Sequence, residues 1–280
     1  MSSSIAEREE PGVRTLLREP NFLSVWLAGG LSGVIRWFQL LALGVYTFET
    51  TGSPLLVSLV PILWMLPLPL FGPLMGVVAD RLNRKRLLVW SLAAVTLGSG
   101  LLTAQAYAGD FDFLHVAAAS ILGGLFWATD MPVRRRILGD LSDRAISTAM
   151  GLDSATGNAT RMTGPLLGGV ALQLVGVTGV FLFSAAVYAV CVLLVVTAKL
   201  PERGERLASP NLLHDLVAGL VFVLGDKRMK RILTITIIFN MFGFPFTSMI
   251  PVIGSDTLGL EPFMVGVLSS LEGFGAFAGA

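Results

Sequence analysis

Long apolar runs separated by short polar connections dominate the pattern along the chain. A bilayer core about 30 Å thick needs about 20 mainly apolar residues in a helix, because lipid offers no hydrogen bonds to an exposed backbone. The pattern therefore predicts an all-α membrane protein with seven complete membrane-spanning helices and an eighth that ends with the chain. Their expected ranges are 22–48, 54–79, 87–108, 113–131, 147–175, 178–198, 232–254 and 262–280.

The basic residues support this list of helices because they alternate between connections. Eighteen of the twenty Lys and Arg residues lie in the N-terminal tail and in the connections after the second, fourth and sixth predicted helices. A missed or invented helix would break this alternation. By the positive-inside rule, the N-terminus is expected in the cytoplasm of a multi-pass protein of the bacterial plasma (inner) membrane. The opposite connections carry no basic residue, and their acidic residues are Glu49, Asp110, Asp112, Asp256 and Glu261.

The longest connection divides the chain into predicted units. Residues 1–21 form a cytosolic tail, 22–199 an N-terminal six-helix bundle, 200–231 a cytoplasmic linker and 232–280 a partial C-terminal bundle. Within the linker, residues 211–224 are apolar but too few to cross the bilayer, and the basic sequence DKRMKR follows them. We expect an interfacial helix there, with its basic end near anionic headgroups. The alternative is that these residues are the opening turns of the seventh membrane helix.

Composition narrows the chemistry further. Hydrophobic residues make up 54% of the chain and charged residues 14%, against about a quarter charged in soluble domains. Cys191 is the only cysteine, so an intrachain disulfide or cysteine-based metal site is excluded. His115 and His214 fall at opposite predicted membrane faces. With no catalytic triad, phosphate-binding loop or metal constellation, we expect no enzyme, no cofactor, no metal site and no nucleic-acid partner.

A glycine, an acid and a basic cluster surround the connection between the second and third predicted helices. They are Gly76, Asp80, Arg81 and Arg84, followed by two more basic residues. Gly76 permits close helix contact, Asp80 can face the positive N-terminal end of a neighbouring helix, and Arg84 can reach a carboxylate on another. This spacing resembles the G-x-x-x-D-R-x-x-R signature of the major facilitator superfamily, which implies a conformational latch. Ordinary positive-inside charge would explain the arginines but not Gly76 together with Asp80.

The fifth predicted helix carries a second motif. It resembles the G-P-x-x-G-G motif of superfamily antiporters and exporters, which uptake members generally lack. Its small residues allow close helix approach, and its proline permits bending. The alternative is a packing face without a role in mechanism. The motif residues are Asn158, Arg161, Gly164, Pro165, Gly168 and Gly169.

Asp130 and Arg134 follow the fourth predicted helix as D-x-P-x-R. This resembles a turn of the secretion-effector branch of the superfamily, which includes enterobactin and macrolide exporters, and we add both residues to the expected latch. The resemblances cover essentially the whole chain. They imply a major facilitator fold with a complete N-terminal six-helix bundle and the first two helices of the C-terminal bundle. Because the superfamily has twelve helices, we expect a chain truncated after the eighth.

Three charged residues lie deep inside predicted membrane helices: Arg36, Arg161 and Glu272. An arginine near the centre of such a helix costs about 2.5–3.5 kcal/mol on insertion scales and needs a partner or water. At 1.5 Å per residue, Arg161 lies about 20 Å from the inner end of its helix and Glu272 about 15 Å from the outer end of its own. The resemblance implies that these helices pack together across the domain interface. We therefore predict an Arg161–Glu272 ion pair that couples protonation to opening, with a static pair as the alternative.

The same resemblance implies that the first and seventh helices line the substrate pathway. Arg36, Gln39 and Asn240 are the expected substrate-cavity residues. Arg36 also stands where the family resemblance leads us to expect an acidic residue, which places an inherited first-helix proton site in doubt. An anionic substrate could be attracted to Arg36, or Arg36 could simply pair with a carboxylate or carbonyl.

These features together predict a secondary active transporter. We expect it to export a small amphipathic or anionic molecule, drug-like or siderophore-like, by proton-coupled alternating access. Its expected partners are that substrate, protons and the lipid bilayer, and the full-length protein is expected to be a monomer. The alternatives are an uptake symporter for a small metabolite and a non-transporting truncated membrane protein.

Overall fold

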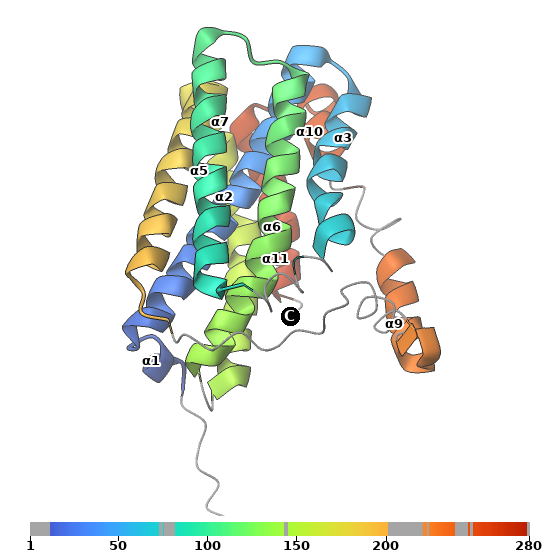
Figure 1. The fold of residues 1–280 in the computed structure, drawn as a ribbon. Coiled ribbons are helices and arrows are strands. Elements are labelled where there is room, and N and C mark those ends of the chain that lie inside the picture. Colours follow the sequence, from blue (N-terminus) through green and yellow to red (C-terminus); the bar gives the residue numbers. More distant parts are fainter. Residues whose placement is uncertain are drawn as a thin grey trace, which may run out of the picture.

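The structure is a computed structural model, and it describes residues 12–72, 75, 82–142, 145–200, 221–222, 224–238, 246 and 249–278. All regular secondary structure in these residues is helical, and most helices stand side by side in one bundle (Figure 1). The elements are α1 (Val13–Leu16), α2 (Pro20–Thr51), α3 (Pro54–Met65), α5 (Arg84–Ala108), α6 (Phe113–Ser142), α7 (Ile146–Thr197), α9 (Lys227–Ile238), α10 (Ile250–Val252), the π-helical turn η4 (Ile253–Thr257) and α11 (Pro262–Ala278).

Local chemistry fixes the ends of these helices. The side chain of Glu19 accepts a hydrogen bond from a backbone N–H in the first turn of α2, and Ser53 and Asn83 cap α3 and α5 in the same way. Gly52 and Gly109 end α2 and α5 with φ of 62° and 82°, a left-handed conformation that glycine adopts without strain. Short polar and glycine segments in the sequence therefore become tight turns between long helices.

Five helices in the described residues are long and apolar enough to cross a membrane. They are Pro20–Thr51, Pro54–Gly72, Arg84–Ala108, Phe113–Ser142 and Ile146–Thr197. At 1.5 Å per residue, even the shortest covers about 28 Å, close to the thickness of a bilayer core. The first four match the first four ranges that the hydrophobic pattern predicts, and the fifth covers both the fifth and the sixth.

The helix α7 is too long to be a single crossing. Its 52 residues would extend about 78 Å if straight. However, Gly176 has φ 62° and ψ −174°, which lies outside the helical region and breaks α7 into two segments. The break falls between the ranges 147–175 and 178–198 predicted from the hydrophobic pattern.

The two segments of α7 run in opposite directions along α2. In the first segment, the side chain of Trp26 donates a hydrogen bond to Thr156 at 2.9 Å, and Gly164 packs against Trp37, so residue numbers rise together. In the second segment, the order reverses. The backbone N–H of Lys199 donates to Asn21 at 2.7 Å, and the thiol of Cys191 lies 3.5 Å from the carbonyl oxygen of Ala28.

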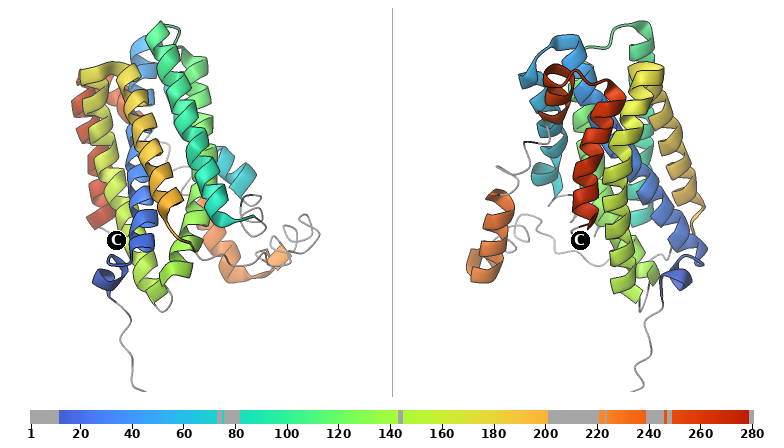
Figure 2. Two further views of the ribbon diagram at one scale, coloured as in Figure 1. Left: turned by 60° about the vertical axis from the view of Figure 1, so that its left-hand side comes forward. Right: turned by 180° about the vertical axis from the view of Figure 1, so that it is seen from behind.

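The segments of α7 link the whole bundle, because α7 contacts α2, α5, α6 and α11 (Figure 2). The outer faces of these helices expose many large apolar side chains. Soluble proteins bury such side chains, but lipid accepts them, so these outer faces are suited to a membrane. Examples more than half exposed are Leu97, Leu101, Leu114, Leu174, Leu182 and Leu193.

In the C-terminal part of the described chain, α11 packs closely on the first segment of α7, whereas α9 stands apart from the bundle in Figure 1 and in the right view of Figure 2. α9 begins at Lys227, so the described helix crosses the predicted boundary between residues 231 and 232. Most of the predicted interfacial helix 211–224 and the middle of the predicted seventh helix lie outside the described residues. Both of those expectations remain predictions.

Candidate functional site

The charged residues of the bundle gather at one end, which we name the basic end because α5 begins there with Arg84 and α6 ends there after three arginines. Arg84 forms an ion pair with Asp140 of α6, and the two side chains are about a quarter and a fifth exposed. This pair provides the carboxylate partner for Arg84 that the sequence motif implied. Gly76, Asp80 and Arg81 lie outside the described residues, so their part in the latch remains a prediction.

A second group at this end is buried except for Arg135, whose side chain is 42% exposed. Arg134 donates from Nε to Asp130 at 3.2 Å and also bonds Asp153 of α7, while Arg135 donates from Nε to the other oxygen of Asp153 at 2.9 Å. We name Asp130, Arg134, Arg135 and Asp153 the basic-end network. Two guanidinium groups face two carboxylates, so the charges within it balance and the pairs hold α6 against the first segment of α7.

Gly29 of α2 completes the enclosure of this network. A Cβ atom at position 29 would lie 2.6 Å from both Cδ and Nη1 of Arg134. Only a glycine lets α2 approach this closely while Arg134 keeps both carboxylate partners. The network thus depends on three helices: two supply the charges and the third closes over them.

The expectation that the fourth helix ends at residue 131, with Arg134 in the turn beyond it, is wrong. The structure places Asp130 and Arg134 inside α6, which continues to Ser142, eleven residues beyond the predicted end. Four residues separate them, so they share one helix face, where they form an i,i+4 ion pair. The prediction ended the helix too early because Pro132 and the charges interrupt the apolar run, but neither interrupts the helix.

The fifth-helix motif packs closely against α2. A Cβ at Gly164 would lie 2.5 Å from Cβ of Trp37 and 2.8 Å from the carbonyl oxygen of Val34, and one at Gly168 would lie 2.5 Å from the carbonyl oxygen of Phe38. These neighbours include backbone atoms, which cannot turn aside as a long side chain can. Both glycines therefore set how closely the two helices approach.

The other face of the same motif packs against α11. Gly169 contacts the backbone of Pro262, and a Cβ at Gly266 would lie 2.7 Å from the carbonyl oxygen of Pro165. Further along, a Cβ at Gly273 would lie 2.7 Å from the backbone of Met162. The motif is therefore the junction at which α2 and α11 meet the same helix.

This junction brings the backbone of residues 272 and 273 to the level of Arg161. A Cβ at Gly273 would also lie 2.8 Å from the carbonyl carbon of Arg161. The side chain of Glu272 is outside what the structure describes, so the Arg161–Glu272 ion pair remains a prediction. Asn158, the remaining motif residue, is half-buried one turn before Arg161.

Away from the basic end, two arginines meet three tryptophans. The guanidinium carbon of Arg36 lies 5.9 Å from the ring centre of Trp37 and 5.6 Å from that of Trp127, and Arg161 lies 5.2 Å from Trp37. Trp64 stacks on Trp127, with ring centres 4.8 Å apart and planes inclined by 17°. We name Arg36, Trp37, Trp64, Trp127 and Arg161 the tryptophan–arginine cluster.

Four helices supply this cluster: α2, α3, α6 and the first segment of α7. Gly123 and Gly124 of α6 let α3 approach, because a Cβ at Gly123 would lie 2.9 Å from Nε1 of Trp64. The ring faces stabilise the arginine charges, since a cation over an aromatic face gains about 0.5–1 kcal/mol when exposed and about 2 kcal/mol when desolvated. The structure therefore supplies partners of a kind that the sequence did not predict for Arg36.

The other expected cavity residues are not part of this cluster. The amide nitrogen of Gln39 lies 3.5 Å from the hydroxyl of Ser99 on α5. Asn240 lies outside the described residues. Of the three, only Arg36 is placed among the tryptophans.

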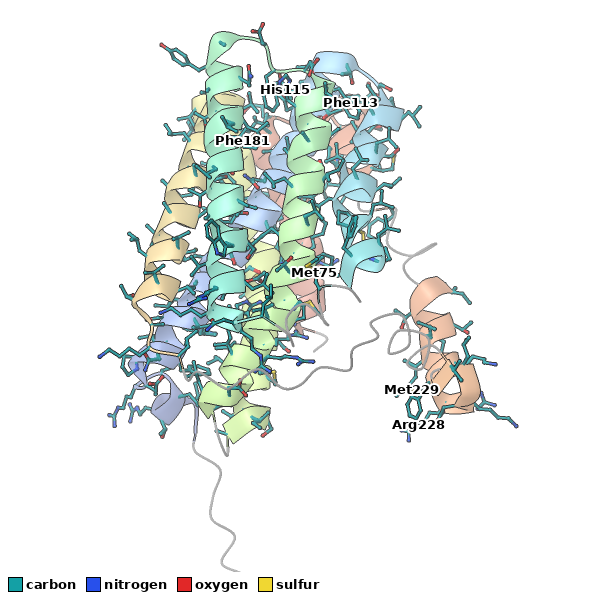
Figure 3. The ribbon with its side chains drawn as sticks, viewed as in Figure 1. Met75, Phe113, His115, Phe181, Arg228 and Met229 are labelled. Carbon is teal, nitrogen blue, oxygen red and sulfur yellow. The ribbon has the colours of Figure 1, made fainter. Side chains whose placement is uncertain are left out.

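The end opposite the basic end is closed by aromatic side chains. Tyr46 of α2 donates a hydrogen bond to the carbonyl oxygen of Phe111 at 2.8 Å, and the ring of Phe111 contacts those of His115 and Phe181. Figure 3 shows His115, Phe113 and Phe181 near this end of the bundle. Apolar packing thus joins α2, α6 and α7 here, whereas at the basic end ion pairs join α6 to α5 and to α7.

The sequence did not single out several residues that build these sites. Asp140 and Asp153 are the carboxylate partners of Arg84, Arg134 and Arg135, and the excess of basic residues at this end could have indicated that such partners were needed. Nothing comparable in the sequence indicated Trp64 and Trp127, since the sequence does not show which faces of α3 and α6 meet. In the described residues, no group of three His, Cys, Asp or Glu side chains is placed to hold a metal ion.

The helices, their exposed apolar faces and their paired internal charges define a multi-pass membrane protein. A family model described as transmembrane secretion effector matches residues 14–280. The chain therefore belongs to the transmembrane secretion effector family of the major facilitator superfamily. This confirms the family resemblance, and membership of a transporter family also confirms that the chain is not an enzyme.

Three bacterial relatives show how the chain compares with known transporters. It is 18% identical over 249 residues to macrolide efflux protein A of Streptococcus pyogenes, covering 88% of this chain and 62% of the relative. It is 24% identical over 249 residues to the staphyloferrin A transporter of Staphylococcus aureus, covering 86% and 61%. It is 26% identical over 236 residues to the uncharacterized MFS-type transporter YfiS of Bacillus subtilis, covering 81% and 52%. The chain thus spans between about half and just over three fifths of their length in these matches.

Proposed function

We propose that this protein exports a small amphipathic or anionic molecule by proton-coupled alternating access. Family membership supports transport, and the names of two relatives, a macrolide efflux protein and a staphyloferrin A transporter, support efflux of drug-like or siderophore-like molecules. The observation that carries the proposal is the glycine junction of α7, where one helix meets α2 on one face and α11 on the other. Such a smooth, closely packed junction allows one bundle to rock against the other.

The proposed topology follows the distribution of basic residues. The N-terminus and the basic end face the cytoplasm, residues 22–199 form a six-helix bundle, and residues 232–280 contribute two helices of a second bundle. In this arrangement, Arg84 and Arg134 belong to a latch that holds the cytoplasmic side, together with Gly76, Asp80, Arg81 and Asp130. The two ion-paired groups at the basic end are the part of this latch that the described residues contain.

Proton coupling is assigned to Arg161 and Glu272. The close approach of Gly273 to the backbone of Arg161 supports this assignment, because the two helices meet at the level of the charged residues. Protonation of Glu272 would remove one charge of the proposed pair. The contact between the bundles would weaken and the equilibrium would shift towards the other state.

The test is transport in inside-out membrane vesicles that contain the protein. With a proton gradient, we expect accumulation of erythromycin, as a macrolide, or of staphyloferrin A, and we expect its loss in Glu272→Gln. The matched control is Asp256→Asn, which removes an exposed acid of η4, the turn that precedes α11. Accumulation in right-side-out vesicles instead would identify an uptake symporter. Unchanged proton-driven export in Glu272→Gln would reduce the pair to a static contact.

A further inference from the structure

Within the part of the chain that the structure describes, two hydrogen-bond donors that α2 contributes to the tryptophan–arginine cluster are buried without an acceptor. They are Nε of Arg36 and Nε1 of Trp37, neighbouring residues on α2. Buried side-chain donors nearly always have a partner, because leaving one unsatisfied forfeits its hydrogen bonds to water. Two such donors on consecutive residues, with the Arg36 guanidinium 5.9 Å from the Trp37 ring centre, therefore indicate a place where an acceptor from outside the chain binds.

Among the residues that the structure describes, no carboxylate fills this role. Asp130 and Asp153 are the acids whose charges act on Arg36, but Arg134 and Arg135 bind both of them. The tryptophan rings act on the positive charge through their faces. They do not accept the N–H groups, which point outward in the plane of the guanidinium group.

The surroundings of these donors also have a shape that favours a planar ligand. Trp64 and Trp127 stack nearly parallel, and Trp37 lies 6.2 Å from Trp64 with an inclination of 41°. Gly123 and Gly124 hold this wall in place by the close approach of α6 to α3. Aromatic rings prefer to stack on such faces with an offset, so the wall suits a flat, apolar group.

We propose that the tryptophan–arginine cluster is a recognition site for an organic anion that carries an aromatic or other planar apolar group. An anionic oxygen of the ligand accepts hydrogen bonds from Nε of Arg36 and Nε1 of Trp37, and the planar group packs on the tryptophan wall. This inference rests on the proposed function, because it specifies the class of exported molecule.

The test measures binding and needs no transport. The purified chain is titrated with 4-nitrobenzoate, an aromatic carboxylate, and with the neutral 4-nitrobenzamide, while tryptophan fluorescence is followed. We expect saturable quenching by the anion with an affinity about tenfold or more above that of the amide, because a hydrogen bond to a charged group contributes about that factor. In Arg36→Gln the preference for the anion should disappear, and in Trp127→Leu both probes should bind more weakly.

Matched controls lie outside the cluster. Arg228→Gln removes the same charge from α9, which stands apart from the bundle (Figure 3), and Trp90→Leu removes an exposed tryptophan of α5. Both should leave the preference unchanged. Equal binding of the two probes, or an unchanged preference in Arg36→Gln, would overturn the proposal and leave water as the acceptor. Anion binding without export in vesicles would count against the proposed function but not against this site.

Discussion

The basic-end network and the tryptophan–arginine cluster compensate the charge of an arginine inside the bundle in different ways. Arg134 and Arg36 both lie inside a bundle whose outer faces are apolar, where an unpaired charge is costly. Arg134 has carboxylate partners on two helices, and none of its buried nitrogens is without an acceptor. Arg36 has ring faces around its charge and a buried donor left open. The first arrangement satisfies the arginine with groups of the protein itself, whereas the second leaves bonding capacity for a ligand.

The largest expected effect comes from breaking the basic-end network. Arg134→Gln leaves Asp130 buried without its ion-pair partner, and removing one member of a buried pair costs about 3–5 kcal/mol. We expect the free energy of unfolding to fall by about 3 kcal/mol. The measurement is equilibrium unfolding of the purified protein in detergent, followed by circular dichroism.

Arg36→Gln is the matched comparison for this substitution. It removes an arginine that ring faces support, so the expected loss is about 1–2 kcal/mol. If both variants lost equal stability, Arg36 would depend on a stabilising partner as Arg134 does, and the contrast between the two regions would be wrong.

The next effect comes from the helix junction that positions the cluster. Gly164→Ala places a Cβ against the backbone of Val34 and the side chain of Trp37, and overpacking of this kind costs about 1–3 kcal/mol. We expect a loss of about 2 kcal/mol, measured by the same unfolding experiment, together with weaker binding of 4-nitrobenzoate. Gly157→Ala is the control, because Gly157 is exposed on the same helix and nothing lies within 4 Å of its added Cβ. A stability loss as large at Gly157 as at Gly164 would mean that helix contact is not the cause.

These contrasts also show what the sequence could predict. Periodic apolar runs and alternating basic connections predicted four of the five long helices to within a few residues at most ends, because lipid imposes the length and charge of each crossing. The glycines at 164 and 168 were predicted to form a packing face, since small residues at helical spacing permit it. The end of α6 was predicted wrongly, because charged residues can extend a helix beyond the apolar core.

Residue partners across helices were the part that the sequence could not supply. Trp64 and Trp127 meet only when α3 and α6 pack through Gly123 and Gly124, and no spacing along the chain encodes that distance. Asp153 was visible as an acid near a helix end, but its place beside Arg134 depends on the rotation of two helices about their axes. Local patterns thus predict elements, whereas sites made from several elements need the tertiary structure.

The smallest effect is expected at the partly exposed ion pair between Arg84 and Asp140 at the basic end. Arg84→Gln breaks the pair with Asp140, and an ion pair that water reaches contributes about 1 kcal/mol or less. Arg86→Gln, which removes an exposed charge two residues away, is the control and should change the unfolding free energy less.

Added salt distinguishes this pair from the buried network. Salt screens exposed charges, so the difference between Arg84→Gln and the unaltered protein should shrink at high ionic strength, whereas the effect of Arg134→Gln should persist. A salt-independent loss at Arg84 would place its ion pair in the same buried class as that of Arg134.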